Sequence, residues 1–249
     1  MINSIRGFLF YIGFSLVLIP TVLVYLLTFA FSENLRWSLA RWYSKTVMQI
    51  LRLTCGVTWE VTGMENLPPA SEPLVILSKH QSAWETLWLF SALPNRVSFV
   101  YKKELHKVPV FGQVLATLGM IAIDRGKGGQ AYRSFMKKGR RFLAKGGWVA
   151  LFPEGTRTEP GADTVYKSGG VRFAIANEVP VLPIALNSGE VWPRNSIAKK
   201  PGVVKVHIGP VIQTKDREFA QVQEEVVNWI ETEMTKISPQ LYAHRLQQK

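Results

Sequence analysis

The sequence predicts an α/β fold, in which a mixed sheet flanked by helices follows an N-terminal pair of membrane-inserted helices. From residue 56 onward, short apolar runs alternate with stretches of helical length, a pattern typical of a sheet covered by helices. Before that point, residues 7–31 contain no charged side chain. The chain therefore divides into residues 1–55, a predicted membrane anchor, and residues 56–249, a predicted catalytic domain.

Residues 7–31 are expected to form an apolar helix inserted in a membrane. Such a helix would be about 37 Å long, enough to cross a hydrocarbon core of about 30 Å with some tilt. Pro20, near its middle, predicts a kink. A cleaved signal peptide is the competing interpretation, but its apolar core would be shorter, and Thr28-Phe29-Ala30 is a poor cleavage site. Whether the helix spans the bilayer or re-enters it stays open.

Residues 34–55 predict a second, amphipathic helix with a basic stripe. An interfacial helix needs this pattern, although an ordinary surface helix packed on the catalytic domain would show it too. More Lys and Arg follow the apolar helix than precede it, which favours an inner (cytoplasmic) membrane location with the catalytic domain on the cytoplasmic side. The stripe consists of Arg41, Lys45 and Arg52, with Trp37 and Trp42 toward its flanks.

The remaining elements are placed by apolar runs and by the helical repeat. Seven strands are expected at residues 58–62, 74–77, 97–101, 120–124, 148–152, 181–186 and 203–208. Helices are expected at residues 85–93, 129–144, 170–177 and 219–237. The polar tail after Pro239 is expected to fray.

His80 and Glu85 are the strongest candidates for catalysis, and they follow the apolar run at 74–77. A carboxylate that holds an imidazole in one tautomer helps the histidine to take a proton from a hydroxyl. Positions i and i+5 lie about 140° apart on a helix, so the two side chains meet only if His80 lies in the turn before a helix and Glu85 in its first turn. The alternative is a helix cap with a carboxylate that favours the helix dipole.

Three further segments accompany this pair. Residues 119–125 read Gly-Met-Ile-Ala-Ile-Asp-Arg, residues 152–157 read Phe-Pro-Glu-Gly-Thr-Arg, and residues 179–184 read Val-Pro-Val-Leu-Pro-Ile. In this order and spacing, the segments resemble the four blocks of the glycerolipid acyltransferase family, and above all its 1-acyl-sn-glycerol-3-phosphate (lysophosphatidic acid) acyltransferases. The resemblance covers roughly residues 74–186. One departure is Glu85, where the family's first block usually ends in Asp.

The resemblance implies a binding site for the acyl acceptor in the second and third blocks. A glycine in the expected exposed turn lets backbone N–H groups approach an anion, and Arg157 offers a forked donor for phosphate. A Glu–Arg pair that braces the turn is the alternative. Lys103 is expected to stabilise an oxyanion or a phosphate, or else to belong to a solvated strand end. By resemblance, the acceptor-binding residues are Glu154, Gly155, Thr156, Arg157 and Arg125.

The net charge and the cysteine and histidine content indicate which kinds of binding partner, disulfide and metal to expect. The net charge of +12 indicates an anionic partner, and anionic lipid explains it better than nucleic acid, for which no binding signature is present. Cys55 is the only cysteine, which excludes an intrachain disulfide and fits a reducing compartment. The four histidines are scattered without metal-ligand spacing, so no metal is expected.

The sequence therefore predicts a membrane-bound O-acyltransferase of phospholipid biosynthesis. It would transfer an acyl group from a thioester to the 2-hydroxyl of lysophosphatidic acid, giving phosphatidic acid. The acceptor is itself the nucleophile, so no cofactor is expected, and either acyl-CoA or acyl carrier protein would bring the acyl group. Two alternatives stay open: another lysolipid or glycerol-3-phosphate as the acceptor, and a non-catalytic, basic, membrane-anchored binding module.

Overall fold

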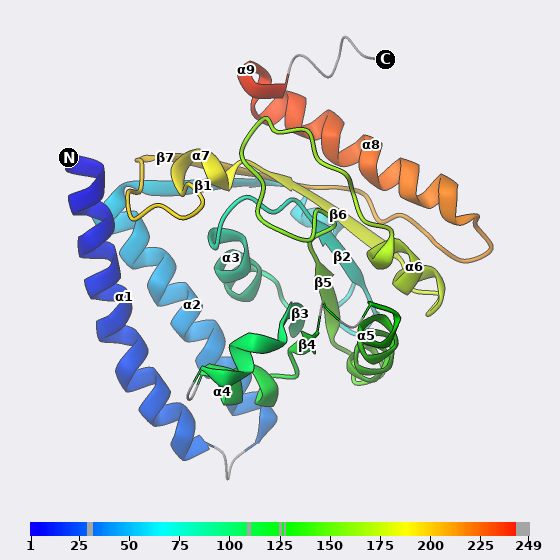
Figure 1. The fold of residues 1–249 in the computed structure, drawn as a ribbon, viewed down its shortest axis with the longest axis horizontal. Helices are drawn as coiled ribbons and strands as arrows, with labels where there is room; N and C mark the ends of the chain where they lie inside the picture. The colour runs from blue at the N-terminus through cyan, green and yellow to red at the C-terminus, as the bar shows by residue number, and fades with distance from the viewer. Residues whose placement is uncertain (29–31, 109–110, 125, 127, 243–249) are drawn as a thin grey trace.

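A single seven-stranded sheet organises the molecule, with helices on both of its faces and a helical hairpin at one end (Figure 1). The structure is a computed structural model that describes residues 1–28, 32–108, 111–124, 126 and 128–242. Across the sheet the strands are β1 (Val57–Thr62), β7 (Gly202–Ile208), β6 (Val181–Leu186), β2 (Val75–Ser78), β5 (Trp148–Leu151), β3 (Val97–Lys102) and β4 (Ile121–Ile123).

The sheet is mixed, as predicted. From β6 to β4 all neighbouring strands run parallel, while β7 pairs antiparallel with β6 and parallel with β1. Every residue of β2 and β6 is buried, as expected for central strands covered on both faces. The seven predicted strands and the α/β class are therefore confirmed.

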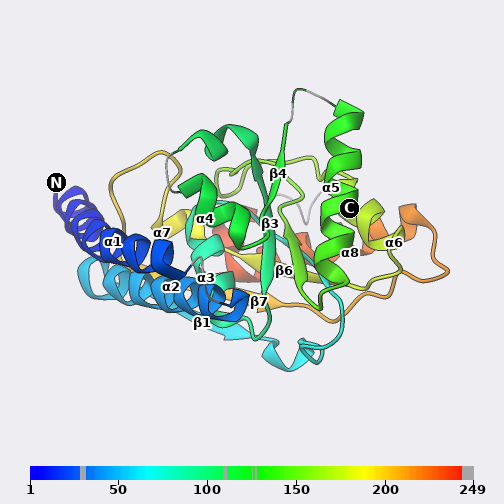
Figure 2. The same cartoon turned by 90° about the horizontal axis from the view of Figure 1, so that it is seen from below.

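Helices α2 and α3 lie on one side of the sheet, and α5 and α6 lie on the other (Figure 2), where α8 also packs against β6. The four helices predicted for the catalytic domain are confirmed as α3 (Trp84–Ala92), α5 (Gly128–Leu143), α6 (Gly169–Ile175) and α8 (Phe219–Ile237). The short helices α4 (Phe111–Thr117), α7 (Ser188–Val191), α9 (Pro239–Tyr242), η2 (Met64–Asn66) and η3 (Lys103–Lys107) were not predicted. Elements of so few residues show no helical repeat in the sequence.

The expectation of a frayed tail after Pro239 is wrong for its first residues. They form α9, and the Tyr242 side chain is fully buried there. Its hydroxyl accepts a hydrogen bond of 3.0 Å from Gln81 Nε2. A contact between positions so far apart has no local signature in the sequence. The rest of the tail, residues 243–249, lies outside the described residues.

The two N-terminal helices, α1 (Ile2–Leu27) and α2 (Glu33–Cys55), lie side by side as an antiparallel hairpin (Figures 1 and 2). Helix α1 begins five residues before the predicted apolar stretch, because backbone hydrogen bonding continues through the polar residues that precede it. Pro20 lies within this continuous helix. Of the predicted stretch, residues 29–31 lie outside the described part of the chain.

Helix α1 packs on the molecule with one face and leaves the other exposed. In the described part of the chain it is the one helix long and apolar enough to cross a membrane, and only 17% of its most apolar window is buried. A core helix of a soluble protein would be mostly buried, so this helix is not one. On α2, Trp42 is exposed, whereas Trp37 is buried against Phe90 with ring centroids 5.5 Å apart. Of the two predicted flanking tryptophans, only Trp42 is therefore free to meet a membrane surface.

Candidate active site

The predicted catalytic segments meet at the carboxyl ends of three neighbouring strands. His80 lies two residues beyond β2, and residues 152–157 follow β5 directly. The register pairs Leu77 of β2 with Leu151 of β5 on one side and with Pro183 of β6 on the other, so β2 and β5 end at nearly the same level and β6 continues beside them to Leu186. Crevices at this edge of parallel sheets are the usual place for binding sites.

His80 and Glu85 face each other as the turn-then-helix geometry requires. His80 precedes α3, and Glu85 lies in its first turn. His80 Nδ1 and Glu85 Oε1 are 3.7 Å apart, an ion-pair distance that is too long for a hydrogen bond. The imidazole stacks on the Phe152 ring, with centroids 3.8 Å apart and planes 12° from parallel. Phe152 therefore fixes the plane of the histidine ring.

The Glu85 carboxylate is completely buried and held from several directions. Gln81 N donates to Oε1, and the Ser82 N–H and hydroxyl both donate to the carboxylate, the hydroxyl at 2.7 Å from Oε2. Burial raises the pKa of Glu85, but the attraction of His80 and these hydrogen bonds more than offset it, so the pKa lies below its ordinary value. Glu85 is thus ionised beside the imidazole at neutral pH.

The turn after β5 holds the backbone of His80 at both ends. The His80 N–H donates to Glu154 Oε1 at 3.2 Å. The His80 carbonyl accepts from Thr158, at 2.9 Å from its N–H and 3.2 Å from its hydroxyl. The first and third blocks of the sequence therefore build one rigid unit around the histidine.

Glu154 departs from the expected exposed turn. Only 5% of the residue is exposed, and its carboxylate points inward, where Oε1 lies 3.3 Å from Lys79 Nζ. Burial raises the pKa of Glu154, and the Lys79 ammonium offsets only part of the rise. The turn itself is confirmed, since Gly155 has a φ of 72°, which favours glycine. Glu154 faces inward because its partners lie beneath the turn.

Lys167 and Arg194 contact this turn, and Arg157 belongs to it. An added Cβ on Gly155 would lie 2.5 Å from Lys167 Nζ, so that ammonium sits directly over the glycine. Arg194 Nη1 donates to the Arg157 carbonyl at 2.9 Å. Thr156 is exposed between these cationic residues. The arrangement suits an anion such as phosphate, because cationic side chains lie beside an exposed hydroxyl.

The other predicted site residues lie farther along the sheet edge. Lys103 begins η3, and its side chain is 61% exposed, with Nζ 4.0 Å from Asp124 Oδ2. Among the described residues, no hydrogen bond or ion pair joins Lys103 to His80. Arg125 lies outside the described residues. Within the described ranges, no group of three His, Cys, Asp or Glu side chains could hold a metal ion.

Sequence reasoning missed three residues of the site. Lys79 is fully buried behind His80, Ser82 holds Glu85, and Phe152 stacks on the imidazole. A signal for Ser82 was present, because Ser-x-x-Glu before an apolar run is a capping pattern that brings the two side chains together. A lysine that ends an apolar strand run was a signal for Lys79. Nothing local predicts the stacking of Phe152.

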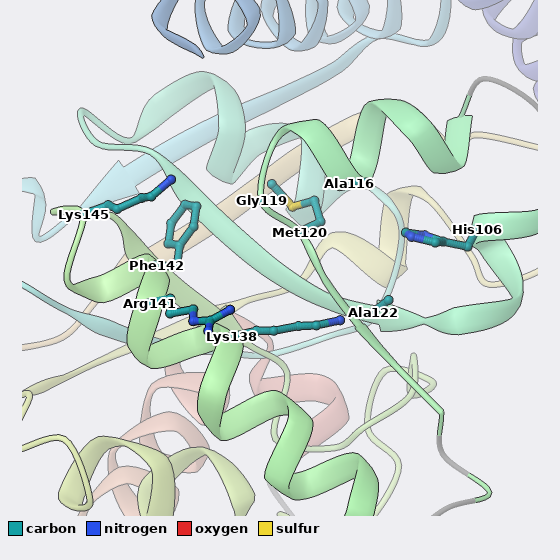
Figure 3. A pocket seen from close by; sticks show the side chains of 9 residues that line it. All are labelled: His106, Ala116, Gly119, Met120, Ala122, Lys138, Arg141, Phe142 and Lys145. Carbon is teal, nitrogen blue, oxygen red and sulfur yellow. The ribbon is translucent and has the colours of Figure 1, made fainter.

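A separate, basic cavity of about 310 Å³ lies between α4, β4 and α5 (Figure 3). Its floor is apolar and includes Met120 and Phe142. Lys138 extends from α5 toward Ala122 of β4, with Arg141 beside it (Figure 3). Residues 128–147 contain six Lys or Arg and no Asp or Glu, at positions Arg133, Lys137, Lys138, Arg140, Arg141 and Lys145.

Comparisons with known proteins agree with the geometry. A family model described as Acyltransferase matches residues 58–187. A Pseudomonas aeruginosa protein named 1-acyl-sn-glycerol-3-phosphate acyltransferase is 40% identical over 212 residues, which are 84% of this chain and 81% of that protein. The human 1-acyl-sn-glycerol-3-phosphate acyltransferase alpha is 34% identical over 148 residues, which are 57% of this chain and 52% of that protein.

The fold is also shared with a solved structure. The crystal structure of the 1-acyl-sn-glycerophosphate (LPA) acyltransferase, PlsC, from Thermotoga maritima matches with a TM-score of 0.72 at 23% sequence identity. The match covers 92% of this chain and 97% of that chain.

Proposed function

Because this chain belongs to the acyltransferase family, we propose that it transfers an acyl group from a thioester to the 2-hydroxyl of lysophosphatidic acid. The observation that carries the proposal is the His80–Glu85 pair, which lies at the same sheet edge as a turn surrounded by cations. The names of the relatives from Pseudomonas aeruginosa and human support the choice of acceptor. The product would be phosphatidic acid.

In the proposed mechanism, His80 takes the proton of the acceptor hydroxyl while that oxygen attacks the thioester carbonyl. The tetrahedral intermediate collapses, the carbon–sulfur bond breaks, and His80 returns the proton to the leaving sulfur. The Glu85 carboxylate stabilises the imidazolium, and the 3.7 Å separation shortens when the ring becomes charged. The acceptor is the nucleophile, so neither an acyl-enzyme nor a cofactor is required.

The acceptor phosphate is proposed to bind at the cationic turn. Arg157, Lys167 and Arg194 supply positive charge there, Thr156 supplies a hydroxyl donor, and Gly155, which has no side chain, leaves room for an anion to approach. The resemblance adds Arg125 to this site and leaves Lys103 as a candidate for stabilising the oxyanion. Glu154 would act on the acceptor indirectly, because a buried carboxylate bonded to the His80 N–H is better placed to orient the histidine than to bind phosphate.

The acyl donor is proposed to dock at the basic cavity beside α5. The phosphates of acyl-CoA and the acidic surface of an acyl carrier protein both require positive charge, and Lys138, Arg141 and His106 border the cavity. Its volume of about 310 Å³ lies at the lower end of the range for small-molecule pockets. The thioester end of the donor would then reach His80 along the carboxyl ends of β3 and β4.

Helix α1 is proposed to insert its exposed apolar face into the membrane that supplies the acceptor. Phe10 packs on Trp192 at 5.2 Å between ring centroids, and the Tyr25 hydroxyl is hydrogen-bonded to Thr117 near the other end of the helix. A helix held against the catalytic domain at both ends cannot also cross the bilayer, so α1 would lie within one leaflet as part of the 1–55 anchor. The proposed location is the cytoplasmic face of the inner membrane.

The anchor also lies beside the proposed acceptor site. The segment after α7 touches both regions, since Arg194 Nη1 donates to the Arg157 carbonyl at 2.9 Å and the Ile197 carbonyl packs against Gly7 of α1. An acceptor could therefore place its phosphate on the turn while its acyl chain stays in the lipid alongside α1.

The test is a transfer assay with purified full-length protein in detergent, a radiolabelled acyl donor and a panel of lysolipids with glycerol-3-phosphate. We expect lysophosphatidic acid to be acylated and His80→Ala to abolish turnover. Preference for another acceptor would change the substrate assignment. Lipid binding without turnover would favour the non-catalytic binding module instead.

Arg157→Ala tests the phosphate site. Loss of one charge-assisted contact should cost about 1.5–3 kcal/mol, seen as a higher acceptor KM with an unchanged donor KM. The effect should be much larger for a phosphomonoester acceptor than for a zwitterionic lysolipid. An unchanged acceptor KM together with a raised donor KM would move Arg157 to the donor site.

A further inference from the structure

Lys79, the residue immediately before His80, is a completely buried lysine that directly follows β2. Burying an ammonium is unfavourable unless its donors are satisfied by charged or polar partners. Lys79 Nζ has three such partners: Glu154 Oε1 at 3.3 Å, Glu231 Oε1 at 3.2 Å and the Tyr166 hydroxyl at 3.1 Å. The contacts to Glu231 and Tyr166 are hydrogen bonds, and the contact to Glu154 is an ion pair, so the ammonium is compensated by two carboxylates and a hydroxyl.

This cluster joins the catalytic loop to parts of the chain outside all four blocks. Glu231 lies on α8, and Tyr166 lies on the loop after the turn at 152–157. The Tyr166 hydroxyl donates to the same Glu231 oxygen that Lys79 contacts. Lys79 also lies over the rings of Tyr166 and Tyr242, at 5.1 and 6.0 Å from their centroids. The ammonium is therefore held from four separate segments.

The cluster reaches the histidine through Glu154. The oxygen of Glu154 that contacts Lys79 also accepts the His80 N–H, at 3.2 Å. At the other end of the His80 backbone, the N–H and the hydroxyl of Thr158 both donate to the His80 carbonyl. A shift of the Glu154 carboxylate would thus release one of the two restraints on the backbone that carries the imidazole.

The stability of the fold does not by itself explain why a lysine and two carboxylates are clustered here. Replacing a buried ion cluster with apolar side chains of similar volume is often neutral or stabilising, because the charges lose their hydration. An apolar residue at position 79 could fill the same space between β2 and α8. The charged groups instead provide a defined geometry, because the ion pairs and hydrogen bonds hold the ammonium and the carboxylates in fixed positions relative to one another.

We propose that Lys79 is a positioning residue, whose ammonium holds the Glu154 carboxylate so that it fixes the His80 backbone, which carries the imidazole. The inference rests on the proposed function, in which His80 is the base. Glu231 and Tyr166 anchor the ammonium from α8 and the loop before α6. The C-terminal helix thereby supports the catalytic geometry without touching substrate.

The test compares Lys79→Met with Lys199→Met. Lys199 is an equally buried lysine with carbonyl and aromatic partners, and none of the hydrogen bonds or ring contacts it makes among the described residues involves His80. We expect Lys79→Met to lower kcat about 10- to 100-fold, as a small misplacement of a catalytic group does, with acceptor and donor KM values within about 3-fold of the parent. Lys199→Met should lower the melting temperature and leave kcat near the parent value.

A second comparison separates positioning from a general loss of order. If Lys79 acts through Glu154, Lys79→Met should lower kcat much less in a Glu154→Gln background than in the parent, because the link is already weakened. Independent, multiplying losses in kcat would overturn the proposal. So would equal kcat values for Lys79→Met and Lys199→Met.

If Lys79→Met does not fold, Glu231→Gln tests the same proposal. That carboxylate is part-exposed at 19%, and its replacement removes one charged partner of Lys79 without a cavity. A several-fold lower kcat at unchanged KM supports the proposal, and a parental kcat overturns it. A parent enzyme that transfers no acyl group, or a fully active His80→Ala, would instead refute the proposed function itself.

Discussion

Among single residues, Glu85 gives the sharpest test of the mechanism, because its buried carboxylate lies 3.7 Å from the proposed base His80. Glu85→Gln should keep the fold but lose the charge that supports the imidazolium. General-base assistance contributes about 10²–10⁴-fold in rate, and most of it should disappear from kcat. Glu85→Asp should be intermediate, because the loop at Gln81 and Ser82 is built around the longer side chain.

Measurement of kcat and melting temperature for the parent and both variants decides the role of Glu85. If Glu85 only starts α3, Asp should serve as well as Glu, and the Gln variant should lose stability more than rate. Equal kcat values for the parent and Glu85→Gln would remove the carboxylate from the proposed mechanism.

The two buried carboxylates of the site should affect stability with opposite dependence on pH. Folding lowers the pKa of Glu85, so the ionised carboxylate adds to the free energy of unfolding above the ordinary pKa of 4.5. This stabilisation is lost as the pH falls through the lower pKa of the folded state. Folding raises the pKa of Glu154, so the protonated carboxyl adds to the free energy of unfolding below the ordinary pKa of 4.5. This stabilisation is lost as the pH rises through the higher pKa of the folded state.

Melting temperatures of Glu85→Gln and Glu154→Gln, measured between about pH 3 and pH 7, check these signs. Relative to the parent, Glu85→Gln should lose less stability as the solution becomes more acidic. Glu154→Gln should show the reverse difference, since it removes a group that binds a proton on folding. Slopes of the same sign in both variants would contradict the assignment.

At the scale of elements, the exposed face of α1 should carry the attachment to membranes. Leu16 and Leu23 are 67% and 59% exposed on this face. Leu16→Glu with Leu23→Glu should weaken binding of the full-length protein to lipid vesicles at least about tenfold, because burying each leucine contributes about 1.5–3 kcal/mol.

Co-sedimentation with vesicles measures this effect. Val203→Glu is the matched control, since Val203 is an exposed apolar residue of β7 on the catalytic domain. Equal vesicle binding by the double variant and the parent would mean that α1 is not the inserted element.

At the scale of the whole molecule, the excess positive charge is unevenly distributed. Residues 128–147, which include α5, contain six Lys or Arg and no Asp or Glu. If this charge receives the donor, Lys138→Gln with Arg141→Gln should raise the donor KM about tenfold or more, while kcat and the acceptor KM stay close to the parent. The donor KM of the parent should also rise with salt.

Lys200→Gln with Lys215→Gln removes the same charge from exposed positions elsewhere and is the control for net charge. Assays with acyl-CoA and with acyl carrier protein thioester then show which donor the cavity favours. A donor KM that changes equally in both double variants would exclude a specific site beside α5.

Much of the architecture follows from local patterns. Apolar runs marked all seven strands, and the helical repeat marked α3, α5, α6 and α8. The spacing of His80 and Glu85 required a turn followed by a helix, which the structure has. The resemblance of the four segments to the acyltransferase blocks is confirmed by the family match to residues 58–187. These features depend on residues within a few positions of one another, so the sequence alone determines them.

The tertiary structure decided which distant side chains share a site. Glu154 was expected to face solvent, but it turns inward because Lys79, which directly follows the neighbouring strand β2, lies beneath it. Lys79 and Glu231 are 152 positions apart and meet only because α8 packs across β6, beside β2. Burial and charge pairing depend on strand order and on the path of the whole chain. No local pattern encodes that path, and so the partners of Lys79, Glu154 and Phe152 emerged only from the fold.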